Sequence, residues 1–350
     1  MTISRILDAN INRAREALRV LEDISRFLLE DSSLTSSLRN MRSQVTSLLS
    51  REGLSAKDLY QARESEEDIG KEFPQKSYTS LKEVINANFS RLQESLRVME
   101  ELYRMKNMEV FPEWRRLRFN AYTLQKEMFL RVEKKEWLKK LDLYVITDEE
   151  ISKKRHEEVA KEAIEGGARF IQLRDKKSST RRILEAGWRI REITRQAGAV
   201  LIINDRVDIA LALDAEGVHL GEEDLPVQEA RKIMGIGKII GASSHSIEEA
   251  LKKQEEGADY VSLGPIFSTS TKKNLPPPLG VEIIREAKKK LRIPLVAIGG
   301  IREENIEEIL EAGSDGVAMI SELLKGESIR DKVKKLREKI TEYREKRKLP

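Results

Sequence analysis

The sequence predicts an α/β domain with the (β/α)₈ fold of a TIM barrel over residues 139–350, preceded by an all-α helical bundle over residues 1–138. The length of 350 residues favours two domains over one. The apolar pattern changes near Leu141, from long helical spacing to short apolar runs that alternate with helices. The first part also contains an internal repeat, which indicates a bundle built from a duplicated helical hairpin.

The second domain contains eight short apolar runs that are typical of strands buried on both faces. They are residues 143–146, 170–173, 200–203, 217–220, 239–243, 260–263, 295–298 and 316–320. Helical patterns lie between them, for example at residues 154–165, 183–197, 247–256 and 303–312. Such a succession of strand–helix units is what a closed parallel barrel requires. A doubly wound open sheet is the alternative arrangement of the same units.

Residues 8–22 and 86–100 of the first domain are two copies of one helical segment. The polar positions that they share are Asn10, Arg13 and Glu16 in the first copy and Asn88, Arg91 and Glu94 in the second. A further helical segment follows each copy, at residues 38–42 and 114–118. The repeat therefore predicts two helical hairpins, at about residues 1–50 and 79–130.

The asparagine of each copy falls on the apolar face of its predicted helix. At about 100° per residue, Asn10 lies on the same stripe as Ala14 and Leu18. Asn88 occupies the equivalent position in the second copy. Because a buried amide needs hydrogen-bond partners, we expect each asparagine to bind Arg or Glu of the other hairpin. A structural polar network is the favoured interpretation of the repeated polar residues, and a ligand site is the alternative.

Cationic and polar residues follow the predicted strands of the barrel, at the ends where the active sites of this fold lie. Arg174 and Lys176 follow the second strand, and Lys272 follows the sixth. Their charges suit phosphate groups, Arg through a two-pronged fork and Lys as a point charge. The hydroxyl and backbone N–H groups of residues 268–271 can surround a diphosphate. We therefore expect a diphosphate site on this rim.

Two aspartates and a pair of glycines complete the predicted rim. Asp205 and Asp224, after the third and fourth strands, supply oxygen ligands for Mg²⁺, with a diphosphate and waters as the remaining ligands. Gly299 and Gly300 follow the seventh strand, and Ser321 follows the eighth. This arrangement predicts a cup in which backbone N–H groups bind a monophosphate.

The composition excludes several classes of protein. Lys and Arg number 64 and Asp and Glu 60, and the resulting net charge of +4 gives no reason to expect nucleic acid as a partner. No apolar stretch approaches the roughly 20 residues of a membrane span, so we expect no membrane partner. The absence of Cys excludes disulfides, thiolate metal sites and a Cys nucleophile, and it fits a cytoplasmic protein. We interpret His219, in the fourth predicted strand, and His245, after the fifth, as structural residues.

Five motifs on the rim closely resemble those of the thiamine phosphate synthase family, in the same order and spacing. They are Gln-Leu-Arg-Asp-Lys at 172–176, Asn-Asp at 204–205, Gly-Glu-Glu-Asp at 221–224, Ser-Thr-Ser-Thr-Lys at 268–272 and Val-Ala-Ile-Gly-Gly-Ile at 296–301. The family joins a hydroxymethylpyrimidine diphosphate to a thiazole phosphate and releases diphosphate, with Mg²⁺ as cofactor. The resemblance covers roughly residues 141–325.

The resemblance implies a role for each matching position. Asp205 and Asp224 would ligate Mg²⁺, and Gln172 and Ser243 would lie beside the pyrimidine and the departing group. The diphosphate would be held by Arg174, Lys176, Asn204, Thr269, Thr271 and Lys272. The thiazole phosphate would be bound by Gly300, Ile320 and Ser321. Candidate catalytic residues within this set are Lys272, Arg174 and Ser243.

The resemblance also implies a mechanism. Mg²⁺ and Lys272 would neutralise the charge that develops on the departing diphosphate. The electron-rich aminopyrimidine would support a carbocation, and the thiazole nitrogen would capture it through its lone pair, so that no general base is needed. An isomerase or lyase on a similar phosphate-binding barrel is the alternative enzyme class. It needs an acid–base pair at the rim, and the diphosphate segment at residues 269–272 argues against it.

The first domain resembles the helical domain that precedes the barrel in some thiamine phosphate synthases. That resemblance implies a second activity in the thiamine pathway, such as pyrimidine phosphate supply or a kinase. The domain contains no P-loop, because Gly53 and Gly70 are its only glycines. A non-catalytic oligomerisation or scaffolding module is the alternative. The expected partners are small-molecule substrates, and the sequence is also compatible with a homo-oligomer.

Overall fold

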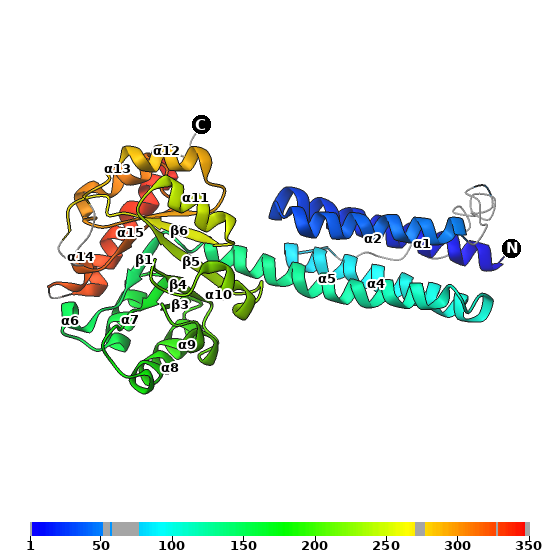
Figure 1. The fold of residues 1–350 in the computed structure, drawn as a ribbon, viewed down its shortest axis with the longest axis horizontal. Helices are drawn as coiled ribbons and strands as arrows, with labels where there is room; N and C mark the ends of the chain where they lie inside the picture. The colour runs from blue at the N-terminus through cyan, green and yellow to red at the C-terminus, as the bar shows by residue number, and fades with distance from the viewer. Residues whose placement is uncertain (1, 52–56, 58–76, 270–276, 327, 347–350) are drawn as a thin grey trace. The chain divides into compact units, whose positions relative to one another are not determined.

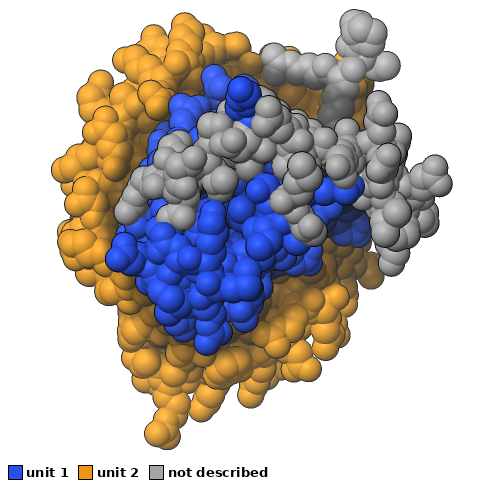
Figure 2. Space-filling model, turned by 90° about the vertical axis from the view of Figure 1, so that its right-hand side faces the viewer, with its two compact units in different colours: residues 1–135 blue, residues 136–350 orange. Residues whose placement is uncertain are grey.

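A computed structural model describes residues 2–51, 57, 77–269, 277–326 and 328–346. The chain forms two compact units, residues 1–135 and 136–350. Figure 1 shows the helices and strands of each unit, and Figure 2 shows the two units in different colours. The domain boundary predicted from the sequence, between residues 138 and 139, falls at the end of helix α5 (Phe111–Leu138).

The first unit is helical, as the sequence predicts (Figure 1). Its helices are α1 (Thr2–Asp23), α2 (Ser32–Arg51), α4 (Leu81–Lys106) and α5 (Phe111–Leu138). A π-helical segment, η1 (Ile24–Leu29), connects α1 to α2. The two copies of the repeat lie in α1 and α4, and these two helices pack against each other.

A buried glutamate in each repeat ties the first helix of its hairpin to the second. Glu22 of α1 is 1% exposed and accepts hydrogen bonds from Arg39, at 3.0 Å, and Arg42, at 3.1 Å. Glu100 of α4, the equivalent residue, accepts one from Arg118 of α5 at 2.7 Å. Burial alone raises the pKa of each carboxyl, but these arginines outweigh it and hold the pKa of Glu22 and of Glu100 below its ordinary value.

The second unit is a closed barrel of eight parallel strands in sequential order, which excludes the doubly wound open sheet. The strands are β1 (Leu143–Ile146), β2 (Phe170–Leu173), β3 (Val200–Asn204), β4 (Gly217–Leu220), β5 (Ile239–Ser244), β6 (Tyr260–Leu263), β7 (Leu295–Ile298) and β8 (Gly316–Met319). Five of them have the predicted bounds, and the other three differ by one residue at the carboxyl end.

Helices follow the strands and cover the outside of the barrel (Figure 1). They are α6 (Glu149–Ser152), α7 (His156–Glu165), α8 (Thr180–Gln196), α9 (Val207–Ala212), α10 (Val227–Met234), α11 (Ile247–Glu255), α12 (Glu282–Lys290), α13 (Ile306–Glu311), α14 (Ser321–Leu324) and α15 (Ile329–Lys346). The helix predicted at residues 303–312 begins as a 3₁₀ turn, η2 (Glu303–Asn305). Across the described part of the chain, no helix has the length and apolar character needed to cross a membrane.

Large aromatic side chains fill the interior of the barrel. Tyr144, Phe170 and Tyr260 are at most 1% exposed and pack edge-to-face, with ring centroids 4.8–6.0 Å apart. Gly241 on β5 makes room for one of these rings, because a Cβ atom there would lie 2.0 Å from Cζ of Tyr260. These side chains therefore fill the interior of the barrel, and the open space lies at the carboxyl ends of the strands.

Candidate active site

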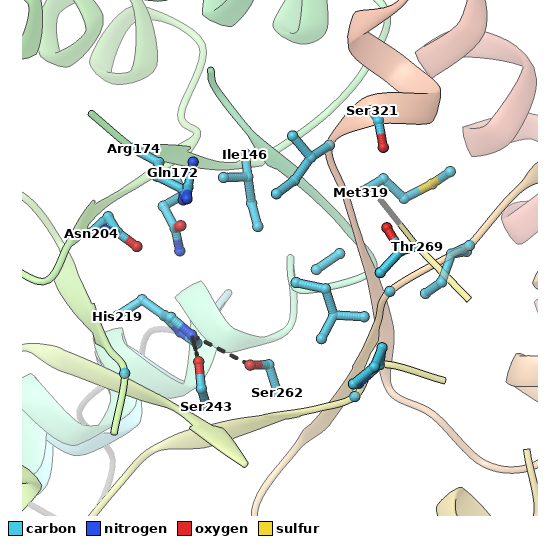
Figure 3. Close-up of a pocket in the computed structure, with 18 of the residues that line it drawn as sticks. Ile146, Gln172, Arg174, Asn204, His219, Ser243, Ser262, Thr269, Met319 and Ser321 are labelled. Atoms are coloured by element: carbon cyan, nitrogen blue, oxygen red, sulfur yellow. Dashed lines mark hydrogen bonds between the residues drawn. The ribbon is translucent and has the colours of Figure 1, made fainter. Parts of the chain in front are cut away.

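A pocket of about 940 Å³ opens at the carboxyl ends of the strands (Figure 3). Every residue predicted for the barrel site that the structure describes lines this pocket. These residues are Gln172, Arg174, Lys176, Asn204, Asp205, Asp224, Ser243, Thr269, Gly299, Gly300, Ile320 and Ser321. Thr271 and Lys272 lie outside the described residues.

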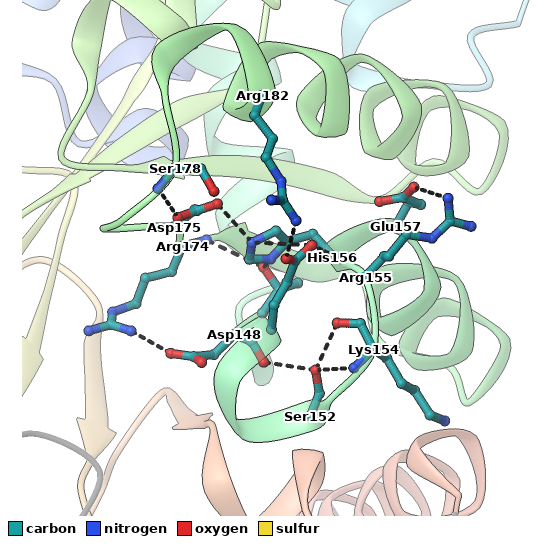
Figure 4. Close-up of polar contacts among 12 residues, drawn as sticks. Asp148, Ser152, Lys154, Arg155, His156, Glu157, Arg174, Asp175, Ser178 and Arg182 are labelled. Atoms are coloured by element: carbon teal, nitrogen blue, oxygen red, sulfur yellow. Dashed lines mark hydrogen bonds and ion pairs between the residues drawn. The ribbon is translucent and has the colours of Figure 1, made fainter.

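The loop after β2 supplies two of the cations that line the pocket, Arg174 and Lys176. Arg174 donates from Nη1 to Oδ2 of Asp148 at 2.7 Å (Figure 4). Asp148 also caps the amino terminus of α6 through its other oxygen, so its position is fixed from two sides. The same loop is shaped by Asp175, whose carboxylate accepts the backbone N–H groups of residues 177 and 178. The predicted phosphate-binding Arg is therefore held in place by Asp148, a residue that the sequence analysis did not identify.

Asp205 and Asp224 form a pair of carboxyl groups that faces the pocket. Burial and the neighbouring Asp224 carboxyl raise the pKa of Asp205 to about 6, against the lowering effect of Lys176, whose Nζ lies 3.2 Å from Oδ2 of Asp205. Asp205 also has a left-handed backbone, with φ of 63°, which a non-glycine residue adopts at some cost. A divalent cation between the two groups would relieve their repulsion, so the donor set fits Mg²⁺. Among the described residues, no group of three or more His, Cys, Asp or Glu is placed to hold a metal ion, so substrate oxygens and waters would complete the coordination.

The two glycines after β7 approach the chain that follows β6 closely. Gly299 and Gly300 have φ of 96° and 66°. A Cβ atom on Gly299 would lie 2.6 Å from Cα of Pro265, and one on Gly300 would lie 2.6 Å from the carbonyl oxygen of Ser268. Only glycine satisfies both the backbone and the space at these positions. With Ile320 and Ser321 at the start of α14, they form the part of the pocket for which the sequence predicts a monophosphate.

Several residues that the sequence analysis did not select also belong to the site. Ser262, Arg302 and Lys325 line the pocket, and Tyr144 and Tyr260 lie beneath it. Arg302 follows β7, and this position after a strand is the signal that could have identified it; Lys325 lies further along, at the end of helix α14, and has no such signal. The two tyrosines carry no such signal, because they lie within strands.

The six repeated polar residues of the helical unit line one groove of about 690 Å³. They are Asn10, Arg13 and Glu16 from α1 and Asn88, Arg91 and Glu94 from α4. The two asparagines are buried, but the partners expected for them are wrong. Each donates to a carbonyl oxygen one turn earlier in its own helix, Asn10 to Ile6 at 2.9 Å and Asn88 to Val84 at 2.8 Å. A helix carbonyl thus satisfies each amide donor, and the polar residues face an open groove.

The closed barrel, with a polar pocket at the carboxyl ends of its strands, has the architecture of a (β/α)₈ enzyme. Comparison with known proteins gives the family. The thiamine monophosphate synthase family matches residues 143–323, and the ThiD2 family matches residues 5–127. The thiamine-phosphate synthase of Prochlorococcus marinus strain AS9601 is 37% identical over 334 residues, which cover 93% of this chain and 92% of that protein. That of Synechocystis is 36% identical over 325 residues, which cover 92% of each. The chain belongs to the thiamine-phosphate synthase family.

Other relatives share only one part of the chain. The thiamine-phosphate synthase of Chloroflexus aurantiacus is 43% identical over 205 residues, covering 58% of this chain and 94% of its own. A solved structure of thiamine phosphate pyrophosphorylase from Pyrococcus furiosus is 42% identical, with a TM-score of 0.55, and covers 59% of this chain and 98% of its own. These two proteins consist almost entirely of the part that they share with this chain. Some members of the family therefore have no counterpart of the part of this chain that lies outside the shared region.

Proposed function

We propose that the barrel joins a hydroxymethylpyrimidine diphosphate to a thiazole phosphate to give thiamine phosphate and diphosphate. The observation that carries this proposal is that one pocket brings together a carboxyl pair, a cationic loop and a glycine cup. The first two suit a diphosphate with Mg²⁺, and the third suits a monophosphate. The two phosphorylated substrates thus have separate anion sites within one cavity, as a condensation between them requires.

We propose a separate role in the reaction for each group of residues in the pocket. Asp205 and Asp224 would hold Mg²⁺, which supplies charge neutralisation for the leaving diphosphate. Arg174, held by Asp148, and Lys176 bind the diphosphate oxygens and keep its axis fixed as the carbon–oxygen bond breaks. The backbone of Gly299 and Gly300, with Ser321, orients the thiazole phosphate so that the ring nitrogen faces the pyrimidine methylene carbon. Lys272, Thr271, Thr269 and Asn204 complete the proposed diphosphate site.

The direct test is to incubate the purified chain with both substrates and Mg²⁺ and to follow thiamine phosphate by mass spectrometry. Product that depends on both substrates and on Mg²⁺ supports the proposal. A folded chain that yields no product at any Mg²⁺ concentration would refute it. The isomerase or lyase alternative is tested in the same reaction, because each substrate supplied alone would then be converted.

The raised pKa of Asp205 predicts a pH dependence of Mg²⁺ use. A proton on Asp205 competes with the metal, so lowering the pH through about 6 protonates the carboxyl and weakens Mg²⁺ binding. We expect the Mg²⁺ concentration for half-maximal activity to rise about tenfold per pH unit below that value and to change little above it. Initial rates over a Mg²⁺ series at several pH values measure this. A half-saturating Mg²⁺ concentration that stays constant through this range would contradict the role of Asp205 as a ligand.

For the helical unit, we propose that the groove between α1 and α4 binds the ligand of a second function in the thiamine pathway. The match to the ThiD2 family fits such a function, and a purely scaffolding role leaves the groove unexplained. Arg13 and Arg91 approach the groove from opposite helices and suit the phosphate of a pyrimidine phosphate. The buried asparagines, whose nitrogens are held by the helix backbone, present their oxygens as acceptors for the ring substituents.

Replacing Arg13 or Arg91 with Ala is expected to weaken binding of hydroxymethylpyrimidine phosphate about tenfold or more, because each loses a charge-assisted contact to phosphate. Calorimetric titration of the full chain measures this. Arg15→Ala is the matched control, since Arg15 is an exposed arginine of the same helix that does not line the groove. Asp205→Asn distinguishes binding in the barrel from binding in the groove. Equal affinities of the Arg13 and Arg15 variants would refute the groove as the site.

The proposal also covers the cofactor, the cellular compartment and the oligomeric state. Mg²⁺ is the cofactor of the barrel, the chain acts in the cytoplasm, and a homo-oligomer is compatible with its activity. Metal analysis, cell fractionation and measurement of the mass in solution, respectively, test them.

A further inference from the structure

A chain of buried hydrogen bonds crosses the floor of the barrel and ends at two residues that line the pocket. Nε2 of Gln172 donates to Oη of Tyr144 at 2.5 Å, and that oxygen lies 2.9 Å from Oη of Tyr260. Tyr260 Oη is 2.9 Å from Nδ1 of His219, whose Nε2 is 3.0 Å from Oγ of Ser243. Figure 3 shows His219 at the cavity with hydrogen bonds to Ser243 and to Ser262, the latter at 3.4 Å. Gln172 on β2 and Ser243 on β5 are thereby connected across the barrel.

The donors and acceptors of this chain fix its direction. Because Tyr144 accepts from Gln172, its own hydrogen points to its other partner, Tyr260. Tyr260 then donates its hydrogen to Nδ1 of His219. A neutral imidazole that accepts at Nδ1 carries its proton on Nε2, so His219 donates to Ser243 at 3.0 Å, with Ser262 as a second and more distant acceptor at 3.4 Å. Ser243 accepts with its oxygen, and its hydroxyl hydrogen is left to point into the pocket.

Burial keeps the two tyrosines of this hydrogen-bond network protonated. Tyr144, Tyr260 and Gln172 are at most 1% exposed. Burial raises the pKa of both tyrosines above the ordinary value, so both phenols keep their hydrogens. Gly241 supports the arrangement, because any side chain there would displace the Tyr260 ring. The two tyrosine hydrogens therefore remain available to donate along this hydrogen-bond network.

We propose that Tyr144, Tyr260 and His219 act as positioning residues that fix what the two ends of the chain offer to the substrate: a carbonyl oxygen at Gln172 and a hydroxyl hydrogen at Ser243. This inference rests on the proposed function of the barrel. At the Gln172 end the amide nitrogen is used by Tyr144, so the amide oxygen faces the pocket as an acceptor. The pair suits a heteroaromatic substrate with an amino donor on one side and an acceptor on the other. It disfavours an analogue with oxygen in place of the amino group.

The tautomer of His219 can be read directly by NMR, without an activity assay. The chain has only three histidines, so a long-range ¹H–¹⁵N spectrum of protein labelled at histidine resolves each imidazole. We expect His219 to be neutral with its proton on Nε2. Tyr260→Phe removes the donor to Nδ1 and should give a mixture of tautomers. Tyr144→Phe removes the hydrogen bond that directs the Tyr260 hydrogen toward His219, and it should shift the tautomers in the same direction but by less. A wild-type His219 with its proton on Nδ1 would overturn the proposal.

Kinetics separate positioning from a merely structural role. Tyr260→Phe should lower kcat/KM for the aminopyrimidine diphosphate about tenfold and should lower kcat/KM for the oxygen-substituted analogue much less. The ratio of the two kcat/KM values, which measures the preference for the amino substrate, should therefore decrease. Tyr343→Phe is the matched control, because it removes a phenol oxygen on α15 that does not belong to this hydrogen-bond network. It should leave the ratio of the two kcat/KM values unchanged. If Tyr260→Phe lowers kcat/KM for both substrates equally, the proposal fails while the proposed function stands. If the tautomers are as expected and no thiamine phosphate forms, the proposed function fails instead, and with it the inference that rests on it.

Discussion

Asp205→Asn is expected to lower kcat/KM by at least about 100-fold and to raise the Mg²⁺ concentration needed for half-maximal rate. Asp205 is one of the two carboxyl groups proposed to bind the metal, and an amide supplies neither the negative charge nor equivalent metal affinity. Initial rates over a Mg²⁺ series measure both effects. Asp208→Asn is the matched control, because that exposed carboxylate of α9 pairs with Arg206 outside the pocket.

The same substitution is expected not to unfold the protein. Since the pKa of Asp205 is raised, its ionised form opposes folding at neutral pH, and an uncharged isostere removes that opposition. Asn also tolerates the left-handed backbone at φ of 63° better than most residues. We therefore expect a Tm equal to or above that of the wild type. An inactive variant with a lowered Tm would indicate a structural role, and an active one with unchanged Mg²⁺ demand would exclude Asp205 as a ligand.

The sequence could predict the barrel because each strand and helix has a local signal. A buried strand appears as a short apolar run, and in parallel topology the residue after that run must lie on the catalytic rim. For this reason the sequence predicts Arg174, Asp205 and Gly300 as rim residues. Their side-chain partners were not identified in the same way. Asp148, which holds Arg174, follows β1, and no local pattern relates the two residues across 26 positions of sequence.

The buried chain beneath the pocket could not be predicted for a similar reason. Tyr144 and Tyr260 are 116 positions apart and meet only because the barrel closes. Taken alone, each tyrosine is typical of a residue in an apolar core. Taken alone, His219 is typical of a structural histidine. Only the joint geometry makes them a connected set with a defined proton direction.

In the helical unit, the wheel placed Asn10 correctly on a buried face but gave the wrong partner. The amide reaches its own helix backbone one turn earlier, at no cost of ordering a residue from another helix. The wheel also cannot say which faces of two helices meet, so it left the choice between a network and a ligand site open. Packing of α1 against α4 places both sets of polar residues at one groove.

Gly300→Ala is expected to raise KM for the thiazole phosphate at least about tenfold, with a smaller effect on KM for the pyrimidine diphosphate. The new Cβ would lie 2.6 Å from the carbonyl oxygen of Ser268 and 2.7 Å from Cβ of Phe267, so the cup must open. A displaced cup no longer points its N–H groups at one phosphate position. The substitution also places Ala at φ of 66°, which costs about 1–2 kcal/mol of folding free energy by itself. Steady-state kinetics with each substrate varied in turn, together with thermal unfolding, measure both effects.

Gly198→Ala separates these two contributions. Gly198 has a φ of 60°, and a Cβ there meets nothing within 4 Å, so it carries the backbone cost without the steric one. We expect its Tm to fall while both KM values stay at the wild-type level. Gly300→Ala should lose more stability than Gly198→Ala, because the contact with Ser268 adds to the backbone cost. If a folded Gly300→Ala keeps the wild-type KM for the thiazole phosphate, then the close approach of the chains after β6 and β7 serves packing alone, and the monophosphate must bind elsewhere in the pocket.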